Sequence, residues 1–157
     1  MIQRIQSVFL LIVFVCMLCV AFLPLWQKNH SESAQEVQLS ALVMKHRKAE
    51  QVITEKKLIY LAVLALAAAA VAFISLLSYS NRMRQMQYGM LNALTMTALM
   101  TLTIFQILQA AKLFEEQDRG EFQPAFWLIV VALVANVLAN RFIRKDEMLV
   151  RSADRIR

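Results

Sequence analysis

Two cysteines, Cys16 and Cys19, stand three residues apart in an uninterrupted apolar stretch of the chain. A Cys-x-x-Cys pair can support disulfide or metal chemistry, and both need the ionised thiolate. We expect both residues at mid-membrane depth, where burial in a medium of low dielectric constant disfavours ionisation. We therefore interpret them as packing residues, with a redox or metal site as the alternative.

The methionines suggest a second kind of chemistry, because thioether sulfur is a ligand that suits Cu(I). Met83, Met86 and Met90 share one helical face, and Met96 and Met100 form a second pair. Unbranched methionine is also a common filler of irregular gaps. The two histidines, His30 and His46, lie outside the apolar stretches and cannot complete a membrane ligand set. We expect no cofactor, no metal and no catalytic residue.

Polar residues inside the apolar stretches are the third candidate. At 1.5 Å per helical residue, Ser75, Asn92, Thr95 and Asn136 all fall roughly 5–10 Å below the membrane midplane, on three different segments. Polar side chains in hydrocarbon face other helices and hydrogen-bond between them. We predict one inter-helix polar cluster of these four residues. It either holds the helices together or binds a small molecule such as a quinone headgroup.

The elements that position these residues follow from composition, which is 59% hydrophobic, with a mean hydropathy of +0.53. Residues 5–27, 58–81, 85–111 and 122–140 contain no charged side chain and number 23, 24, 27 and 19. About 20 apolar residues cross a bilayer as a helix, and the stretches lack the alternation of barrel strands. The first is too long for a signal peptide and has no clear cleavage site, so we expect it to be retained.

We predict an all-α integral membrane protein with a single domain over residues 1–157 and a four-transmembrane-helix bundle. The helices are expected at about 5–26, 58–81, 86–111 and 122–141. No ionisable residue lies within a span, which argues against a proton-coupled transporter or pump. No glycine-rich re-entrant segment is present, which argues against a selective ion channel.

Charge places both termini in the cytoplasm. Residues 1–4, 82–84 and 141–157 hold 9 Lys and Arg against 3 acids, whereas residues 28–57 and 112–121 hold 8 of each. Cytoplasmic segments are enriched in Lys and Arg, although Lys56 and Lys57 oppose this orientation. Interfacial aromatic residues provide a second indication. Trp26, Tyr60 and Trp127 are expected at the outer ends of helices, and Tyr79 and Tyr88 at the inner ends.

Two segments outside the spans are long enough to contact partners. In the outer segment, 28–57, Ser33 and Glu36 have capping-box spacing, which predicts a short periplasmic helix with Leu39, Leu42 and Val43 on its apolar face. The tail, 142–157, is predicted to be a basic amphipathic helix. Anionic headgroups attract such a helix. A protein partner is the alternative for the tail, and also for the outer helix, which otherwise lies on the bundle.

The two ends of the chain resemble a known family. Residues 1–7 (MIQRIQS), Asn140-Arg141, Lys145-Asp146-Glu147 and residues 149–155 (LVRSADR) are similar to small inner-membrane proteins of Bacteroidota classed as domain of unknown function 4293. The resemblance implies a bacterial cytoplasmic membrane and four helices, and it supplies no activity. With both ends on one side, we predict a docking patch of Arg4, Arg151, Asp154 and Arg155.

These observations favour a non-enzymatic accessory or scaffold subunit of an inner-membrane assembly. The alternative is a binder or transporter of a small apolar or lipid-like molecule, using the polar cluster. A redox protein using Cys16 and Cys19 comes third. The expected partners are anionic lipid headgroups at the cytoplasmic face, other membrane proteins or a second copy of the chain, and not nucleic acid.

Overall fold

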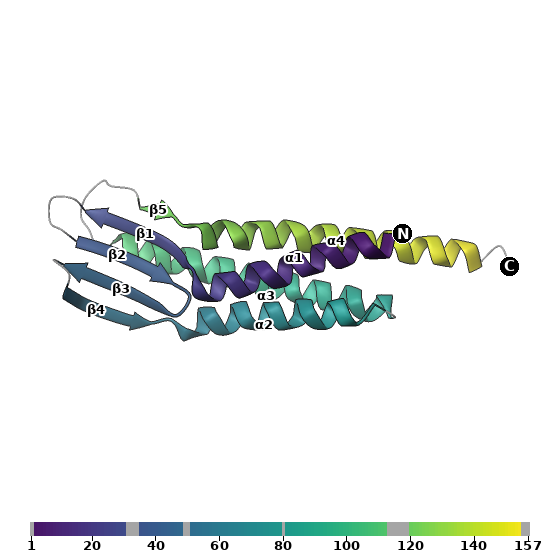
Figure 1. Ribbon diagram of the computed structural model, residues 1–157, viewed down its shortest axis with the longest axis horizontal. Helices are drawn as coiled ribbons and strands as arrows, with labels where there is room; N and C mark the ends of the chain where they lie inside the picture. Colours follow the sequence, from purple (N-terminus) through teal and green to yellow (C-terminus); the bar gives the residue numbers. More distant parts are fainter. Residues whose placement is uncertain (1, 31–34, 49–50, 80, 113–119, 155–157) are drawn as a thin grey trace.

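Four long helices and a small sheet make up the computed structural model, which describes residues 2–30, 35–48, 51–79, 81–112 and 120–154 (Figure 1). The helices are α1 (Ile2–Phe22), α2 (Ile59–Leu77), α3 (Arg82–Ala111) and α4 (Pro124–Asp154). Each is long and apolar enough to cross a membrane. The prediction of four such helices is confirmed.

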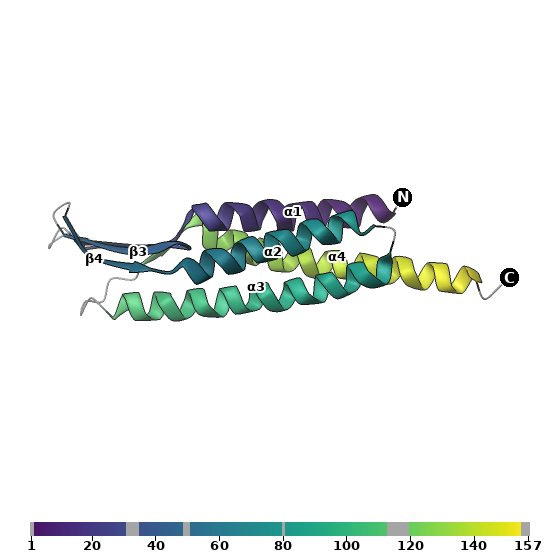
Figure 2. The same ribbon diagram turned by 90° about the horizontal axis from the view of Figure 1, so that it is seen from below.

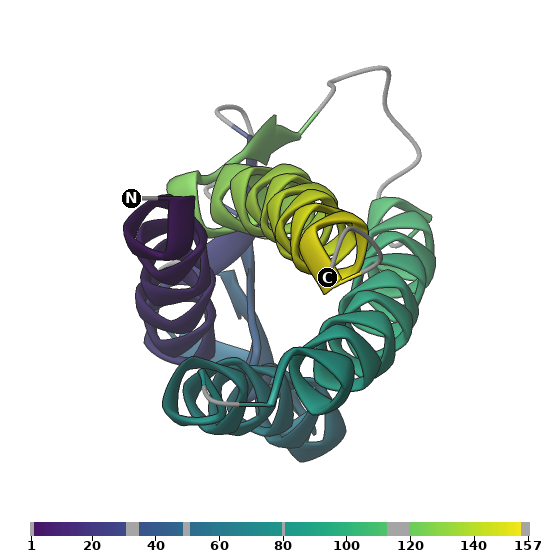
Figure 3. The ribbon, with the colours of Figure 1, turned by 90° about the vertical axis from the view of Figure 1, so that its right-hand side faces the viewer.

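The helices form a ring in which α1 and α3 each pack against both α2 and α4 (Figure 3). On α2, five small residues are buried, namely Ala62, Ala65, Ala68, Ala69 and Ala72. Small residues let helix backbones approach closely, which drives helix packing in a membrane. The start of α1 and the end of α4 lie at the same end of the bundle, which we call the terminal end (Figures 1 and 2).

The opposite end carries a five-stranded antiparallel sheet, so the prediction of an all-α fold with an outer helix in 28–57 is wrong. Its strands are β1 (Pro24–His30), β2 (Gln35–Ser40), β3 (Val43–Lys48), β4 (Gln51–Lys57) and β5 (Glu121–Phe122). The order across the sheet is β4-β3-β2-β1-β5. Four strands come from the segment between α1 and α2, and the short fifth strand precedes α4.

Alternation of buried and accessible residues explains the sheet. Trp26 pairs with Leu39, which pairs with Met44, and all three are buried. Their neighbours Gln38 and Lys45, also paired with each other, are only partly buried. A period of two suits a sheet with one covered face. Of the predicted capping box, Ser33 lies outside the described residues and Glu36 is part of β2.

The turn between β2 and β3 has no glycine to mark it. The Ser40 hydroxyl accepts a hydrogen bond from the Val43 backbone N–H (3.2 Å) and donates one to the Val43 carbonyl (2.8 Å). Ala41 and Leu42 therefore form a tight loop that a serine side chain closes, as in other turns that use Ser for this purpose. Leu42 is exposed in this turn and Leu39 is buried in β2, so they do not share the face predicted for a helix.

The end of α3 nearest the sheet joins the edge strand to the bundle (Figure 2). On α3, the Gln106 side chain accepts a hydrogen bond from Lys56 Nζ of β4 (3.3 Å) and donates one to the Tyr60 hydroxyl. Lys56 faces the same side of the sheet as its pairing partner Met44. Gln106, near the end of the 30-residue helix α3, therefore hydrogen-bonds both to β4 and to the start of α2.

Several helix ends differ from the prediction: α2 ends at Leu77 instead of residue 81, and α3 begins at Arg82 instead of residue 86. Helix α1 stops at Phe22 because Pro24 begins β1, and Trp26 is buried within the sheet and does not lie in an aromatic belt. The predicted tail helix is a continuation of α4, which projects beyond the other helices (Figure 1). No glycine or proline follows Pro124 to interrupt it.

Candidate functional site

Three of the four predicted cluster residues are buried between helices. Ser75 on α2, Asn92 on α3 and Asn136 on α4 are each at most 1% exposed. Thr95 is only partly buried, and its hydroxyl donates to the Leu91 carbonyl of its own helix (3.0 Å). Among the described residues, no hydrogen bond joins any two of the four.

The contacts that connect the helices use two residues that the sequence analysis did not select. Gln85 Nε2 donates to the Ser75 carbonyl (3.2 Å), which links α3 to α2. Asn136 Nδ2 donates to the Gly89 carbonyl (2.9 Å), which links α4 to α3. A Cβ atom at Gly89 would lie 1.9 Å from Asn140 Oδ1, so the Asn140 side chain packs directly against the glycine. The inter-helix contacts therefore use backbone carbonyls.

Several buried polar atoms in this half of the bundle have no hydrogen-bond partner in the described part of the chain. They are both amide atoms of Gln6 and of Asn92, and the side-chain oxygens of Gln85, Asn136 and Asn140. An unsatisfied polar group in a dry interior costs several kcal/mol. Gln6 lies on α1, Gln85 and Asn92 lie on α3, and Asn136 and Asn140 lie on α4, so three helices contribute these atoms.

An ion pair closes the bundle at the terminal end. Arg82 Nη2 lies 3.1 Å from Asp146 Oδ2, and Arg82 Nη1 donates to the Asp146 carbonyl (3.4 Å). The pair joins the first residue of α3 to α4. The pair lies beyond the end of α2, where α3 begins.

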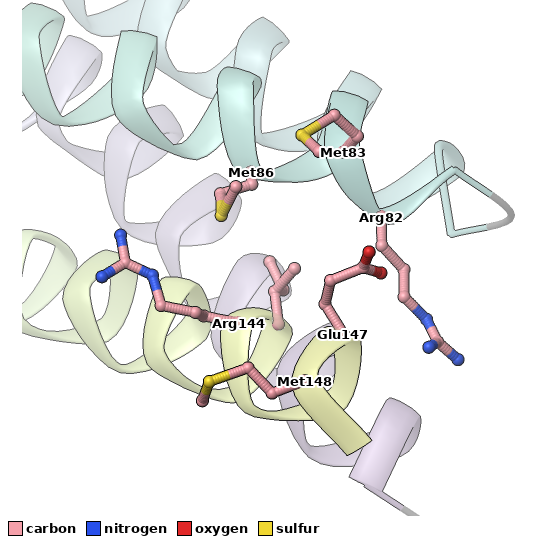
Figure 4. Close-up of a pocket in the computed structure, with 7 residues that line it drawn as sticks. Arg82, Met83, Met86, Arg144, Glu147 and Met148 are labelled. Carbon is pink, nitrogen blue, oxygen red and sulfur yellow. The ribbon is translucent and has the colours of Figure 1, made fainter. Parts of the chain in front are cut away.

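Two hollows lie beside α4 at this end, and Figure 4 shows residues that line the first. The first, of about 270 Å³, lies between α3 and α4, with an apolar lining of Met83, Met86, Ile143 and Met148 and with Arg82, Arg144 and Glu147 as its charged residues. The second, of about 550 Å³, runs along α4 beside Leu138, Arg141, Phe142 and Lys145. Arg144 and Met148 line both hollows.

The other predicted sites have mixed outcomes. Cys16 is buried, Cys19 is partly buried, and both are free thiols. Met83 and Met86 line the first hollow, whereas Met90 of the same predicted face is 68% exposed. No group of three His, Cys, Asp or Glu side chains suited to a metal occurs among the described residues.

The side chains of the predicted docking patch are not among those that the structure describes. Arg4 belongs to α1, and Arg151 and Asp154 belong to α4, but their side chains are not described; Arg155 lies outside the described residues. Contact between the two ends of the chain remains a prediction at these positions. Further along the same two helices, Phe9 of α1 stacks on Phe142 of α4 with ring centroids 5.7 Å apart.

Comparison with known proteins gives one result. A family profile described as a domain of unknown function (DUF4293) matches residues 2–156. The chain belongs to this family. The DUF4293 match spans all four helices and all five strands, and it confirms the resemblance seen at the two ends. No curated protein matches the chain significantly. The description of DUF4293 gives no activity, so the proposals below rest on geometry.

Proposed function

We propose that this DUF4293 protein is a non-enzymatic accessory or scaffold subunit of a bacterial inner-membrane assembly. In this proposal, both termini are cytoplasmic, the four helices anchor the chain, and the sheet is presented on the outer side. The observation that supports it most is the open edge of the sheet at β4. Anchored chains that display a sheet edge can hold a partner beside them by strand addition.

Strand β4 has the properties of a receptive edge. In the described part of the chain it pairs with β3 alone, and Val52, Thr54, Glu55, Lys56 and Lys57 are all exposed. An edge strand offers a row of backbone donors and acceptors to an incoming strand. Lysines and a register shift opposite His46 and Arg47 limit indiscriminate pairing. The edge is therefore selective as well as open.

The uncovered face beside this edge carries charge in cross-strand rows. Lys45 lies opposite Glu55, and Glu36 lies opposite Arg47. Gln27 Nε2 also donates to Glu36 Oε1 (2.9 Å). Because opposite charges face each other across neighbouring strands, the face is balanced in itself. A partner with complementary polar groups gains specificity there more than affinity.

The position of β4 favours a partner in the same membrane. Lys57 ends the strand, and α2 begins at Ile59. The open edge therefore meets the bundle within two residues of a spanning helix. An outer segment of a neighbouring membrane protein, or of a second copy of this chain, can reach it without a long linker.

A photo-crosslinking amino acid at Thr54, on the edge, is expected to give one discrete adduct in intact cells. The same probe at Asn29, exposed on β1, should give none. Lys57→Glu should reduce the Thr54 adduct, because it reverses a charge at the edge, whereas Lys48→Glu on the neighbouring strand should not. Mass spectrometry of the adduct identifies the partner. Equal adducts at both probe positions, or equal effects of both charge reversals, would contradict the proposal.

A second candidate function is binding of a small apolar or lipid-like molecule between α2, α3 and α4. The buried amide atoms of Asn92, which have no partner in the described part of the chain, favour it. A ligand with one hydrogen-bonding group would satisfy them. The Discussion gives the substitution that separates this function from a purely structural role.

A further inference from the structure

The charges around the two hollows at the terminal end are unbalanced. Arg82 is paired with Asp146, and Glu147 has a contact of its own. Arg141, Arg144 and Lys145 are exposed and make no ion pair with any described residue. Three cations therefore border an apolar surface without a matching carboxylate.

These cations lie close to the level of lipid phosphates. The Arg82–Asp146 pair marks the point where α2 has ended and α3 begins. Lys145, Arg144 and Arg141 precede Asp146 by one to five residues, or roughly 2–8 Å of helix rise. The uncharged part of α4 ends immediately before them, at Asn140. If α4 crosses a bilayer, all three side chains start at the interface.

The direction of α4 turns these side chains toward the bilayer. Helical side chains lean toward the N-terminus of their helix, and α4 begins at the sheet end of the bundle. Figure 4 shows the Arg144 side chain directed away from both Glu147 and Arg82. Its guanidinium group is thus free to receive an anion from the membrane side.

The apolar part of the site suits a hydrocarbon chain. Leu138 and Phe142 line the second hollow together with Arg141, Arg144 and Lys145. Both apolar residues precede Arg144 on α4, which runs from the sheet end to the terminal end, so they lie on the membrane side of this arginine. Leu138 is only partly buried, so its side chain is accessible from outside the bundle. A phosphate on Arg144 therefore lies next to an apolar surface for an acyl chain.

We propose that the terminal end of this protein has a specific site for an anionic phospholipid of the adjoining leaflet. Arg144, with Arg141 and Lys145, binds the headgroup phosphate, and an acyl chain lies along Leu138 and Phe142 of the second hollow. The inference requires that the helices cross the membrane. It does not depend on the accessory function proposed above, because it uses the opposite end of the molecule.

Native mass spectrometry of the full chain in detergent tests the site. We expect phosphatidylglycerol to bind more tightly than phosphatidylcholine with the same acyl chains. Arg144→Gln should weaken phosphatidylglycerol binding about fivefold, the effect of one basic residue near an anionic surface. The control is Arg84→Gln, an exposed arginine at the same end that lines neither hollow, and it should leave binding unchanged.

Further variants test the two halves of the site separately. The combination Arg141→Gln, Arg144→Gln and Lys145→Gln should remove the preference for phosphatidylglycerol, and Leu138→Gln should weaken both lipids. The three basic positions are exposed, so their replacement should leave folding unaffected. Equal losses for Arg144→Gln and Arg84→Gln would show diffuse attraction only and overturn the proposal. No preference between the two lipids in the unaltered protein, or equally tight binding of soluble glycerol phosphate, would also overturn it.

Discussion

Replacing Trp26 with alanine is expected to lower the free energy of unfolding by about 3–5 kcal/mol, as for other buried aromatic residues. Trp26 is 2% exposed and stands where three strands meet, opposite Leu39 of β2 and Phe122 of β5. A Cβ atom at Gly120 would lie 2.1 Å from its indole ring, so the backbone just before β5 packs directly on Trp26. Removing the ring leaves a cavity that β5 and the start of α4 border.

Thermal unfolding in detergent measures this effect. At about 2–4 °C per kcal/mol for a chain of this size, the midpoint should fall by roughly 6–20 °C. Trp127→Ala is the matched control, because this tryptophan is 57% exposed on the first turn of α4 and should shift the midpoint by under about 2 °C. Equal shifts for the two variants would mean that Trp26 does not hold the sheet to the bundle.

Replacing Asn92 with leucine is expected to stabilise the protein by about 1–3 kcal/mol. Both amide atoms of Asn92 are buried without a partner among the described residues, and an apolar side chain of similar size removes that penalty. Asn136→Leu should act in the opposite direction, because it deletes the 2.9 Å hydrogen bond to the Gly89 carbonyl. Hydrogen bonds between membrane helices contribute on the order of 0.6–1.7 kcal/mol.

The sign of the Asn92 effect separates the two roles considered for the polar cluster. Stabilisation, measured as a raised unfolding midpoint in detergent, indicates a residue that no ligand uses. Destabilisation indicates that the amide is satisfied by a bound molecule or water, as the lipid-like-ligand function requires. In that case the purified variant should also lose a molecule that co-purifies with the unaltered chain.

The helices could be predicted from the sequence, whereas the sheet could not. A charge-free run such as residues 58–81 has one low-energy solution in lipid, because a helix satisfies its own backbone. The segment between α1 and α2 carries two competing local patterns. The Ser33–Glu36 spacing favours a helix start, and the alternation through Val37, Leu39 and Met44 favours strands. The pairing with β1 and β5 decides between them, and that information is not local.

The candidate site shows the same limit at the level of side chains. Counting residues gave the depth of Ser75, Asn92 and Asn136, and burial at these positions follows from their polarity in an apolar stretch. It did not give rotation about the helix axis, so Thr95 was placed in the cluster although its hydroxyl bonds to its own helix. The hydrogen-bond acceptors at Ser75 and Gly89 are backbone carbonyls, and the sequence cannot single these out because every residue has one.

The proposed arrangement in the membrane is tested most directly by cysteine labelling in intact cells. In a variant with Cys16 and Cys19 replaced by alanine, a single cysteine at Glu55 of β4 should react with an impermeant thiol reagent. A single cysteine at Arg84, beside the turn between α2 and α3, should react only after the membrane is made permeable. Labelling of both positions from the same side would contradict a bundle that crosses the bilayer with its sheet outside and its termini inside.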